Sequence, residues 1–521
     1  MVADLQRAGQ DLSRAGQRLG AELSTLCIPA SSGQQVIDVG VWADEQVADL
    51  RRRLTTIQQT HDVPTITQAT AAFGLFGKYA PDWGGIADLT AAAGKGDAMA
   101  LKTLVDMQNS GKNMTLAARL NAWWGQLSPE ARNRLIATSP SLVGSLDGLP
   151  ATVRDQANRK FLAESKAEIA DELSRLQASS EEATKAIEGL KLKMRQIASV
   201  EKGLARGGKD GIPPALLLQL ELEGRGKTAI SYGNPDEADN IAVYVPGTGT
   251  ILDGFGDDDA ERATVMWQQA HKFQESKTHA TIAWLGYEAP QWGVSFVMPN
   301  ESPAAMFAAL NGAPLLASFT DGLRAAHKPA SSARLTVLGH SYGSTVTGAA
   351  AQRRPPGAFA DQVIFVGSPG VSATKAKDLG VNAVWVGEAP NDPVGDFGSI
   401  PSVPVHISKE GGMKLYSKES AVLGIDPSDS AFGAKQFYVE DSGDSLSSFK
   451  AHSLYWNRRS VSLMNIGHLI NGQYDALVPF PKPAPVVTPP PPTAPPSPAP
   501  RPVPTESPSP HPLPSPSPAG E

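Results

Sequence analysis

Hydrophobic positions in residues 1–224 recur at helical spacing. Near the start of the chain, leucines follow one another at seven-residue intervals, which places them on one face of a helix. They are Leu5, Leu12, Leu19 and Leu26. Ser128 directly before Pro129 predicts a later helix start, because serine caps free amides and proline at the first helical position loses no hydrogen bond. We expect an all-α region here, a bundle or long hairpin, with a partner-binding coiled coil as the alternative.

The pattern changes at residue 225. From there to residue 480, short runs rich in β-branched residues alternate with stretches of helical periodicity. The predicted strands are Thr228–Tyr232, Ile241–Val245, Ala280–Leu285, Arg334–Leu338, Gln362–Val366, Ala383–Val386 and Gln436–Val439. The predicted helices are Asp258–Glu275, Ala304–Ala326, Ser344–Arg353 and a stretch after Ser447. Apolar strands that alternate with helices predict an α/β fold, with a mostly parallel sheet covered by helices on both faces.

Residues 481–521 form a third regime, in which nearly half of the positions are proline. Proline has no backbone N–H and cannot continue a helix or pair inside a sheet, so we expect a disordered, extended tail. A passive tether and a docking segment for a protein partner are both compatible with this composition. The N-terminal helices are the other candidate for a protein partner.

Composition narrows the partners and cofactors. Hydrophobic residues make up 41% of the 521 residues, enough for a buried core over most of the chain, and the formal net charge is -7. No block of lysine and arginine is present, so we expect no nucleic-acid partner. Cys27 is the only cysteine, which excludes an intramolecular disulfide and a thiolate zinc site. We expect neither a metal nor another cofactor.

The sequence shows no sign of a membrane-spanning helix or a signal peptide. No apolar run approaches the roughly 18 residues that a membrane-spanning helix needs. The first residues, from Met1 to Leu5, lack the basic start and apolar stretch of a signal peptide. A cytoplasmic protein is the default expectation, and export by a route that needs no signal peptide is the alternative.

One motif carries chemistry, and it lies between a predicted strand and a predicted helix. Gly339, Ser341 and Gly343 match G-x-S-x-G, the nucleophile elbow of α/β hydrolases. The serine of such an elbow lies on a strained turn, and side chains at the two glycine positions would collide with nearby backbone. In a chain with 49 glycines this short pattern is weak evidence by itself, because chance alone produces it often. Its position after a strand and before a helix favours a nucleophile over a structural serine in a tight turn.

A nucleophilic serine needs a base and an orienting acid, which follow it in the order acid, then histidine. Asp392 is the predicted acid, in a turn-rich loop directly after the strand that ends at Val386. Its carboxylate would accept a hydrogen bond from the imidazole and stabilise the imidazolium. Glu388 and Asp396 lie on the same loop and compete with it. A simple turn-forming role before Pro393 is the alternative for Asp392.

Four histidines follow the serine, and His452 is the predicted base. It comes after the last predicted strand and a polar loop, directly before an aromatic-rich helix. His468 lies later, where it could cap or pack a helix. His406 lies in an apolar alternation typical of a strand, and His511 lies in the proline-rich tail.

The oxyanion of an acyl-transfer reaction needs two backbone donors near the serine. We expect one to be the N–H of Tyr342 and the other the N–H of Thr248, in a glycine-rich turn after an early strand. An ordinary turn is the alternative for that segment. Phosphate binding there is disfavoured because no P-loop pattern follows.

At these residues the chain resembles the actinobacterial α/β-hydrolase family catalogued as DUF1023. The resemblance covers residues 225–460. The matching segments are Tyr244-Val-Pro-Gly-Thr-Gly, Gly339-His-Ser-Tyr-Gly-Ser-Thr-Val, Asn391-Asp-Pro-Val-Gly and His452-Ser-Leu-Tyr. The resemblance implies an α/β-hydrolase fold with a triad of Ser341, Asp392 and His452. It implies no particular substrate.

Together these features predict a metal-free serine hydrolase. The expected substrate is a small-molecule or lipid-like acyl ester, cleaved through an acyl-enzyme intermediate on Ser341. Two alternatives remain open at this point. The chain could be a secreted or scaffold interaction protein with a vestigial hydrolase core, or an acyltransferase whose acceptor is not water.

Overall fold

The computed structural model describes residues 85–176, 181–291, 306–328, 333–394, 423–441 and 450–480. Several predictions concern residues outside these ranges. They are the leucine stripe from Leu5 to Leu26, Cys27, Asp396, His406, His511 and the tail 481–521. The chain divides into two compact units, residues 1–481 and 482–521, so all of the described residues belong to the first.

The centre of the fold is an eight-stranded sheet with the order β1-β2-β4-β3-β5-β6-β7-β8. The strands are β1 (Ala215–Glu221), β2 (Lys227–Tyr232), β3 (Asn240–Val245), β4 (His279–Leu285), β5 (Arg334–His340), β6 (Gln362–Val366), β7 (Ala383–Gly387) and β8 (Lys435–Gln436). Strand β2 pairs antiparallel with both β1 and β4, and all other neighbouring pairs are parallel. The prediction of a mostly parallel sheet is therefore confirmed.

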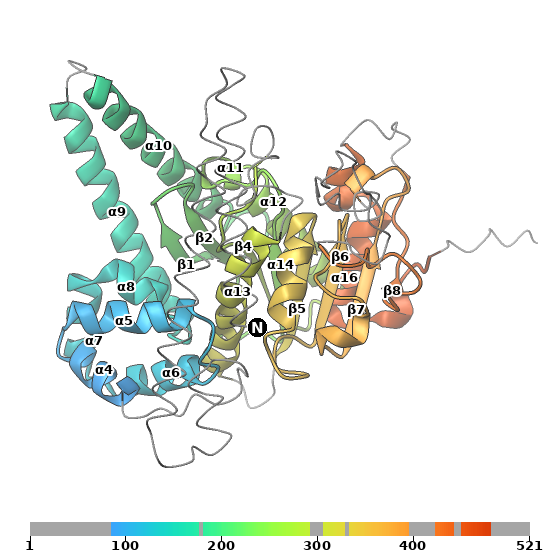
Figure 1. Cartoon of the computed structure of the whole chain (residues 1–521), viewed down its shortest axis with the longest axis horizontal. Helices are drawn as coiled ribbons and strands as arrows, with labels where there is room; N and C mark the ends of the chain where they lie inside the picture. The colour runs from blue at the N-terminus through green and yellow to red at the C-terminus, as the bar shows by residue number, and fades with distance from the viewer. Residues whose placement is uncertain are drawn as a thin grey trace, which may run out of the picture. The chain divides into compact units, whose positions relative to one another are not determined.

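Helices cover both faces of this sheet (Figure 1). The α-helices that come after β3 in the chain are α11 (Leu252–Phe255), α12 (Asp259–Phe273), α13 (Phe307–Ala326), α14 (Tyr342–Ala351) and α16 (Val461–Asn471). Short 3-10 helices are η2 (Ala376–Leu379), η4 (Ala451–Trp456) and η5 (Tyr474–Ala476). Each predicted strand and helix of this region overlaps an observed element, although β8 begins one residue early and is shorter than predicted.

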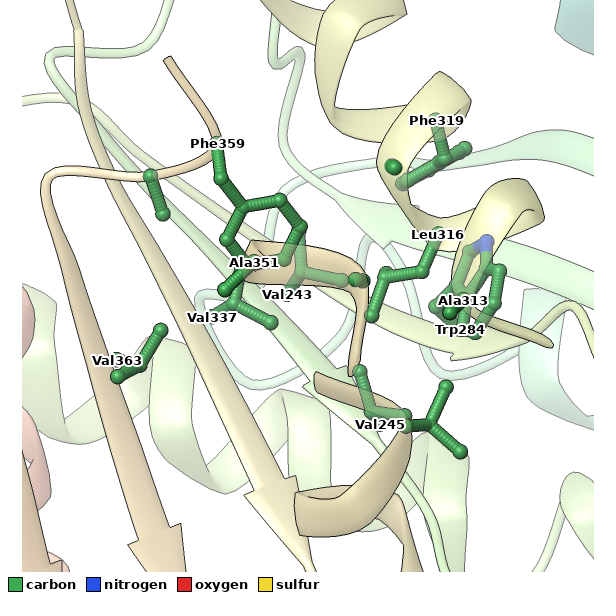
Figure 2. Close-up of a cluster of buried hydrophobic side chains, with 14 of the residues drawn as sticks. Val243, Val245, Trp284, Ala313, Leu316, Phe319, Val337, Ala351, Phe359 and Val363 are labelled. Atoms are coloured by element: carbon green, nitrogen blue, oxygen red, sulfur yellow. The ribbon is translucent and has the colours of Figure 1, made fainter. Parts of the chain in front are cut away.

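Alternation along the strands separates two apolar cores. Val243 packs in the core that α13 and α14 cover, whereas its neighbour Tyr244 packs in the core that α12 and α16 cover. Side chains of a strand point to opposite faces in turn, so an apolar run of this kind requires helices on both sides. Figure 2 shows part of the first core, where Val243 and Val337 gather with Leu316 and Phe319.

Strand β1 lies before the boundary that the sequence pattern predicts between residues 224 and 225. Its residues pair with β2 from Ala215 opposite Tyr232 to Glu221 opposite Lys227. The strand reads Ala-Leu-Leu-Leu-Gln-Leu-Glu, which contains no β-branched residue, and its composition therefore favours helix. Pairing with β2 outweighs this propensity, and the α/β sheet starts about ten residues earlier than the composition change suggests.

The preceding region is helical, as predicted, over its described part. Its helices are α4 (Gly85–Gly94), α5 (Ala98–Asn109), α6 (Leu116–Gln126), α7 (Pro129–Thr138), α8 (Pro140–Ser145), α9 (Ala151–Arg175) and α10 (Glu181–Leu204). Ser128 caps α7 by accepting a hydrogen bond from the Ala131 N–H at 3.2 Å, which confirms the predicted helix start. Helix α9 joins this region to the sheet, because Asn158 donates a hydrogen bond to the Leu217 carbonyl of β1 at 2.9 Å.

Within the described ranges, no helix combines the length and the apolar character needed to cross a membrane.

Candidate active site

Ser341 lies in the turn between β5 and α14, in a backbone conformation that L residues rarely adopt. Its φ is 55° and its ψ is -133°. The two neighbouring glycines are required by space. A Cβ on Gly339 would lie 2.6 Å from the Ser344 Cα, and one on Gly343 would lie 2.2 Å from the Val245 carbonyl oxygen. The local geometry is thus that of a strand-to-helix elbow, with the serine at the N-terminal end of α14.

Parallel strands bring the predicted residues to one edge of the sheet. Strands β3, β5, β6 and β7 run parallel in neighbouring positions, so the loops after their carboxyl ends leave the sheet on the same side. Thr248 follows β3, Ser341 follows β5 and Asp392 follows β7. His452 reaches this edge from η4.

His452 and Asp392 form a buried pair. The His452 Nδ1 atom lies 2.8 Å from Asp392 Oδ2 and 3.0 Å from Oδ1. The Asp392 side chain is 0% exposed and that of His452 is 10% exposed. Of the three acids on this loop, Asp392 is the one bonded to the imidazole, and Glu388 is half-buried. Asp396 lies outside the described residues.

Further donors keep the Asp392 carboxylate ionised. Tyr455 donates its hydroxyl hydrogen to Oδ2 at 2.6 Å, and the Val394 N–H donates to Oδ1 at 3.0 Å. Burial raises the pKa of Asp392, but the hydrogen bonds and charge of His452, with the bonds from Tyr455 and Val394, outweigh burial and lower the pKa below its ordinary value. The carboxylate can therefore accept the Nδ1 hydrogen of His452. In that tautomer Nε2 carries no hydrogen and can accept a proton.

Ser341 and His452 line one cavity of about 540 Å³. Their side chains make no hydrogen bond to each other within the described structure. In a site without substrate, such bonds are often long and tighten only when substrate binds. The shared cavity is thus the observation that links the serine to the His452–Asp392 pair.

His340 lines the same cavity, and the sequence pattern did not indicate a place for it in the site. Its Nε2 lies 2.8 Å from the His452 carbonyl oxygen, so Nε2–H is the donor and the bond fixes the backbone of His452. The two imidazole rings lie 4.5 Å apart. Burial first, and then the charges of His452 and Arg262, lower the pKa of His340 well below its usual range. His340 therefore stays neutral and can hold His452 without repelling it.

The turn after β3 lies against the serine. A Cβ on Gly247 would lie 2.4 Å from Ser341 Cβ and 2.9 Å from Ser341 Oγ, so this glycine is required by the closeness of the two segments. Thr248 lines the same cavity, and its N–H donates to none of the described residues. Tyr342 is the first residue of α14, where helix amides point away from the helix interior. The structure brings both predicted donor residues next to the cavity.

His468, the competing base, has other partners. Its Nδ1 lies 2.8 Å from Gln473 Oε1, and its ring stacks on Phe273 with the centroids 3.9 Å apart. This is the packing role considered for it above. Among the described residues, no group of three or more His, Cys, Asp or Glu side chains is arranged to hold a metal ion.

Comparison with known proteins finds a family model that resembles this domain. Residues 223–402, about a third of the chain, match a model described as "Alpha/beta hydrolase". This part of the chain is therefore similar to α/β hydrolases. The matched range contains Ser341 and Asp392 and ends before His452.

Similar proteins occur in mycobacteria. An uncharacterized protein of Mycobacterium tuberculosis strain H37Rv is 31% identical over 380 residues, which cover 70% of this chain and 57% of the relative. An uncharacterized protein of Mycobacterium bovis is 32% identical over 188 residues, which cover 34% of this chain and 66% of the relative. The match thus spans little more than half the length of the first relative.

Two solved structures also show some likeness. One, titled "Structure of arylesterase", has 12% identity and a TM-score of 0.30, covering 60% of this chain and 97% of that one. The other, a hyperthermophilic esterase from the archaeon Pyrobaculum calidifontis, has 14% identity and a TM-score of 0.26, covering 60% of this chain and 98% of that one. Likenesses at these TM-scores carry no argument about the substrate.

Proposed function

We propose that this α/β hydrolase cleaves a carboxylic ester through a triad of Ser341, His452 and Asp392. The observation that supports this most is the buried His452–Asp392 pair, which shares a cavity with a serine in a strained elbow. A serine hydroxyl is a weak nucleophile unless a base removes its proton, and a base needs a partner that sets its tautomer. The proposed substrate is a small-molecule or lipid-like acyl ester.

In the proposed reaction, His452 Nε2 takes the proton of the Ser341 hydroxyl while Oγ attacks the acyl carbonyl carbon. The N–H groups of Tyr342 and Thr248 stabilise the negative oxygen of the tetrahedral intermediate. The C–O bond to the alcohol then breaks, and His452 returns the proton to the leaving oxygen. Water attacks the resulting acyl-enzyme, again losing a proton to His452, and the acid leaves as Ser341 regains its hydrogen.

The cavity volume of about 540 Å³ fits this proposal, because pockets for small-molecule ligands measure roughly 300–1,000 Å³. Hydrolysis of 4-nitrophenyl esters with short and long acyl chains tests the activity. The expected result is turnover of at least one chain length, with the free acid as the product. If an added alcohol receives the acyl group in place of water, acyl transfer is the better description. No turnover of any ester would favour a binding protein with a vestigial hydrolase core.

Gly367 offers a test of the His452–Asp392 pair that touches neither residue. It follows β6 with a φ of 53°, and a Cβ there would lie 2.6 Å from Asp392 Oδ2 and 2.8 Å from His452 Nδ1. A methyl group at that point must push the two bonded side chains apart. We expect Gly367→Ala to lower kcat/KM for ester hydrolysis by about tenfold to a hundredfold, as misplacements near 1 Å do in enzymes. Steady-state kinetics measures this effect.

Gly357→Ala is the matched control. Gly357 also has a positive φ, 80°, but nothing lies within 4 Å of the Cβ that alanine would add. The substitution therefore introduces a similar backbone strain, roughly 1–2 kcal/mol, without touching the pair. Equal losses of kcat/KM in both variants would show that strain, rather than displacement of the pair, causes the effect.

A further inference from the structure

Arg262 brings a positive charge into the cavity that contains Ser341. It lies on α12, and its side chain is 20% exposed. Among the described residues that line the cavity, it is the only lysine or arginine. The proposed ester hydrolysis gives this guanidinium no part, because the oxyanion is stabilised by backbone amides.

Three neighbouring side chains hold the guanidinium in place. Its Cζ lies 4.8 Å from the centre of the Trp456 ring. The Arg262 Nη1 donates to the Tyr244 hydroxyl at 2.6 Å and lies 3.3 Å from Asp259 Oδ1. The face of one indole and two polar contacts on one nitrogen therefore fix the orientation of the planar group, which lowers the entropy lost on binding a ligand.

Trp456 also connects Arg262 to the proposed catalytic residues. The Trp456 ring lies 4.9 Å from the ring of His340, which in turn lies 4.5 Å from the ring of His452. The cation is thus separated from the histidines by one aromatic side chain. A substrate that reaches Ser341 in this cavity can contact Arg262 with another part of the same molecule.

The other edge of the guanidinium has no hydrogen-bond partner among the described residues. Among the described residues, every hydrogen bond and ion pair of the Arg262 side chain uses Nη1, and none accepts a hydrogen bond from Nε or Nη2. These two nitrogens present parallel N–H groups, the arrangement that binds a carboxylate or phosphate with two hydrogen bonds. An arginine whose second edge is free and whose position is fixed is suited to recognise such a group.

The two acids that also line the cavity do not occupy this edge. Asp259 is buried and contacts Arg262 through Nη1, and burial raises its pKa above the ordinary value. Asp258 is exposed, so water and salt screen its charge strongly. For an anionic group of a substrate, direct hydrogen bonds to the partly buried guanidinium outweigh the repulsion from the exposed carboxylate of Asp258.

From these observations we propose that Arg262 forms an anion subsite of the cavity, and that the natural ester carries a carboxylate or phosphate group apart from the scissile bond. The inference rests on the proposed ester hydrolysis. The anion is a carboxylate or a phosphate. The experiment below decides whether it belongs to the acyl part or to the alcohol part of the ester.

Two matched pairs of esters test the subsite in the full-length protein. The acyl pair is the 4-nitrophenyl ester of adipic acid and that of hexanoic acid, which differ in a terminal carboxylate. The alcohol pair is 1-butyryl glycerol 3-phosphate and 1-butyryl glycerol. We expect the wild type to prefer the anionic member of at least one pair. Arg262→Met should lower the ratio of kcat/KM for the anionic ester to that for the neutral ester by about tenfold or more, since hydrogen bonds to charged groups are stronger than those between neutral groups.

Two further variants separate recognition from a structural effect. Arg458 is an exposed cation bonded to Gln268 of α12, so Arg458→Met removes a nearby positive charge outside the cavity and should leave the ratio unchanged. Asp259→Asn removes the competing carboxylate and should raise the ratio. If Arg262→Met instead lowers kcat/KM equally for both esters of each pair, the residue has a structural role and the proposed subsite is wrong.

The wild type alone can also overturn the inference. Hydrolysis of the neutral esters with no preference for either anionic partner contradicts the subsite and leaves the proposed ester hydrolysis standing. Hydrolysis of none of the four esters contradicts both. Arg262→Lys keeps the charge but loses the two-nitrogen edge, and we expect it to recover only part of the preference.

Discussion

Replacing Ser341 by alanine should lower kcat for ester hydrolysis by about 10⁴-fold or more while the protein remains folded. The nucleophilic oxygen is lost, and the other serine among the described residues that line the cavity, Ser453, lies in η4 and not in a strand-to-helix elbow. The Ser341 hydroxyl makes no hydrogen bond to another described side chain, so its removal leaves no buried partner unsatisfied. Nitrophenol release measures kcat, and thermal unfolding measures stability.

Ser341→Gly is the informative companion to this variant. Alanine keeps the Cβ and therefore the strain of a positive φ, whereas glycine removes both. We expect the glycine variant to be as inactive as the alanine variant but to have a Tm at or above that of the wild type, because strained functional positions cost about 1–3 kcal/mol. Residual activity above about one hundredth of the wild type in both variants would contradict a role for Ser341 as nucleophile.

Replacing Asp392 by asparagine should lower kcat by about 10³-fold to 10⁴-fold, a size of effect seen when the acid of other serine triads is changed. The carboxylate accepts hydrogen bonds from His452 and Tyr455 at 2.8 Å and 2.6 Å. Both of these bonds reach Oδ2, and the Val394 N–H donates to Oδ1. The single oxygen of an amide cannot serve both positions, so its NH₂ group meets another donor. When the NH₂ group faces Nδ1, the hydrogen of the ring moves to Nε2, and His452 can no longer take the serine proton.

Asp392→Glu and Tyr455→Phe serve as controls for this variant. Glutamate keeps the charge but displaces it in a site where the carboxylate is fully buried, so activity should fall less than with asparagine. Phenylalanine at Tyr455 removes the 2.6 Å bond to Oδ2 and the bond that the Ala389 N–H donates to the hydroxyl at 3.2 Å, but it keeps the carboxylate, so it should have the smallest effect of the three. An Asp392→Asn variant with activity close to the wild type would show that another group orients His452.

The same carboxylate makes stability depend on pH. Burial raises the pKa of Asp392, but its hydrogen bonds, led by that from His452, bring the folded-state pKa below the ordinary value of about 3.9. The folded state therefore holds the proton more weakly than the unfolded state. Its contribution to stability is complete above about pH 4 and is lost as the pH falls through the folded pKa. The Tm difference between wild type and Asp392→Asn should accordingly be largest near neutral pH and should narrow below about pH 4.

Most of the α/β domain follows from the pattern of the chain. Strands such as Gln362–Val366 are dense in β-branched residues, which predicts them from local composition, and the structure confirms them. Strand β1 was missed because Ala215–Glu221 has the composition of a helix, and only its pairing with β2 makes it a strand. Local composition does not contain that information.

In the site, too, local sequence patterns predict some residues and long-range contacts decide others. Ser341 could be predicted because the elbow requires glycines at fixed positions beside it, a local steric demand. Loop position predicts Asp392 but leaves Glu388 and Asp396 of the same loop as competitors, and the structure gives Asp392 the bond to His452. The parts played by His340 and Tyr455 depend on contacts across more than sixty residues, which no local pattern reveals.

Arg262 was missed for a related reason. In the sequence it is one basic residue of an amphipathic helix with acidic residues in its first turn, a pattern typical of a solvated helix face. Its significance comes from Trp456, nearly two hundred residues later, which holds it at the wall of the cavity. Charged residues of helices that begin at the carboxyl edge of a sheet are therefore worth examining as substrate contacts.

The role of Ser341 as nucleophile is tested most directly by covalent labelling. A fluorophosphonate reacts far faster with a serine that a neighbouring base activates than with other residues, and mass spectrometry of peptides locates the adduct. We predict one adduct per chain, on Ser341, which is absent in Ser341→Ala and strongly slowed in His452→Ala. An adduct on another residue, or equal labelling of the wild type and Ser341→Ala, would contradict the proposed chemistry.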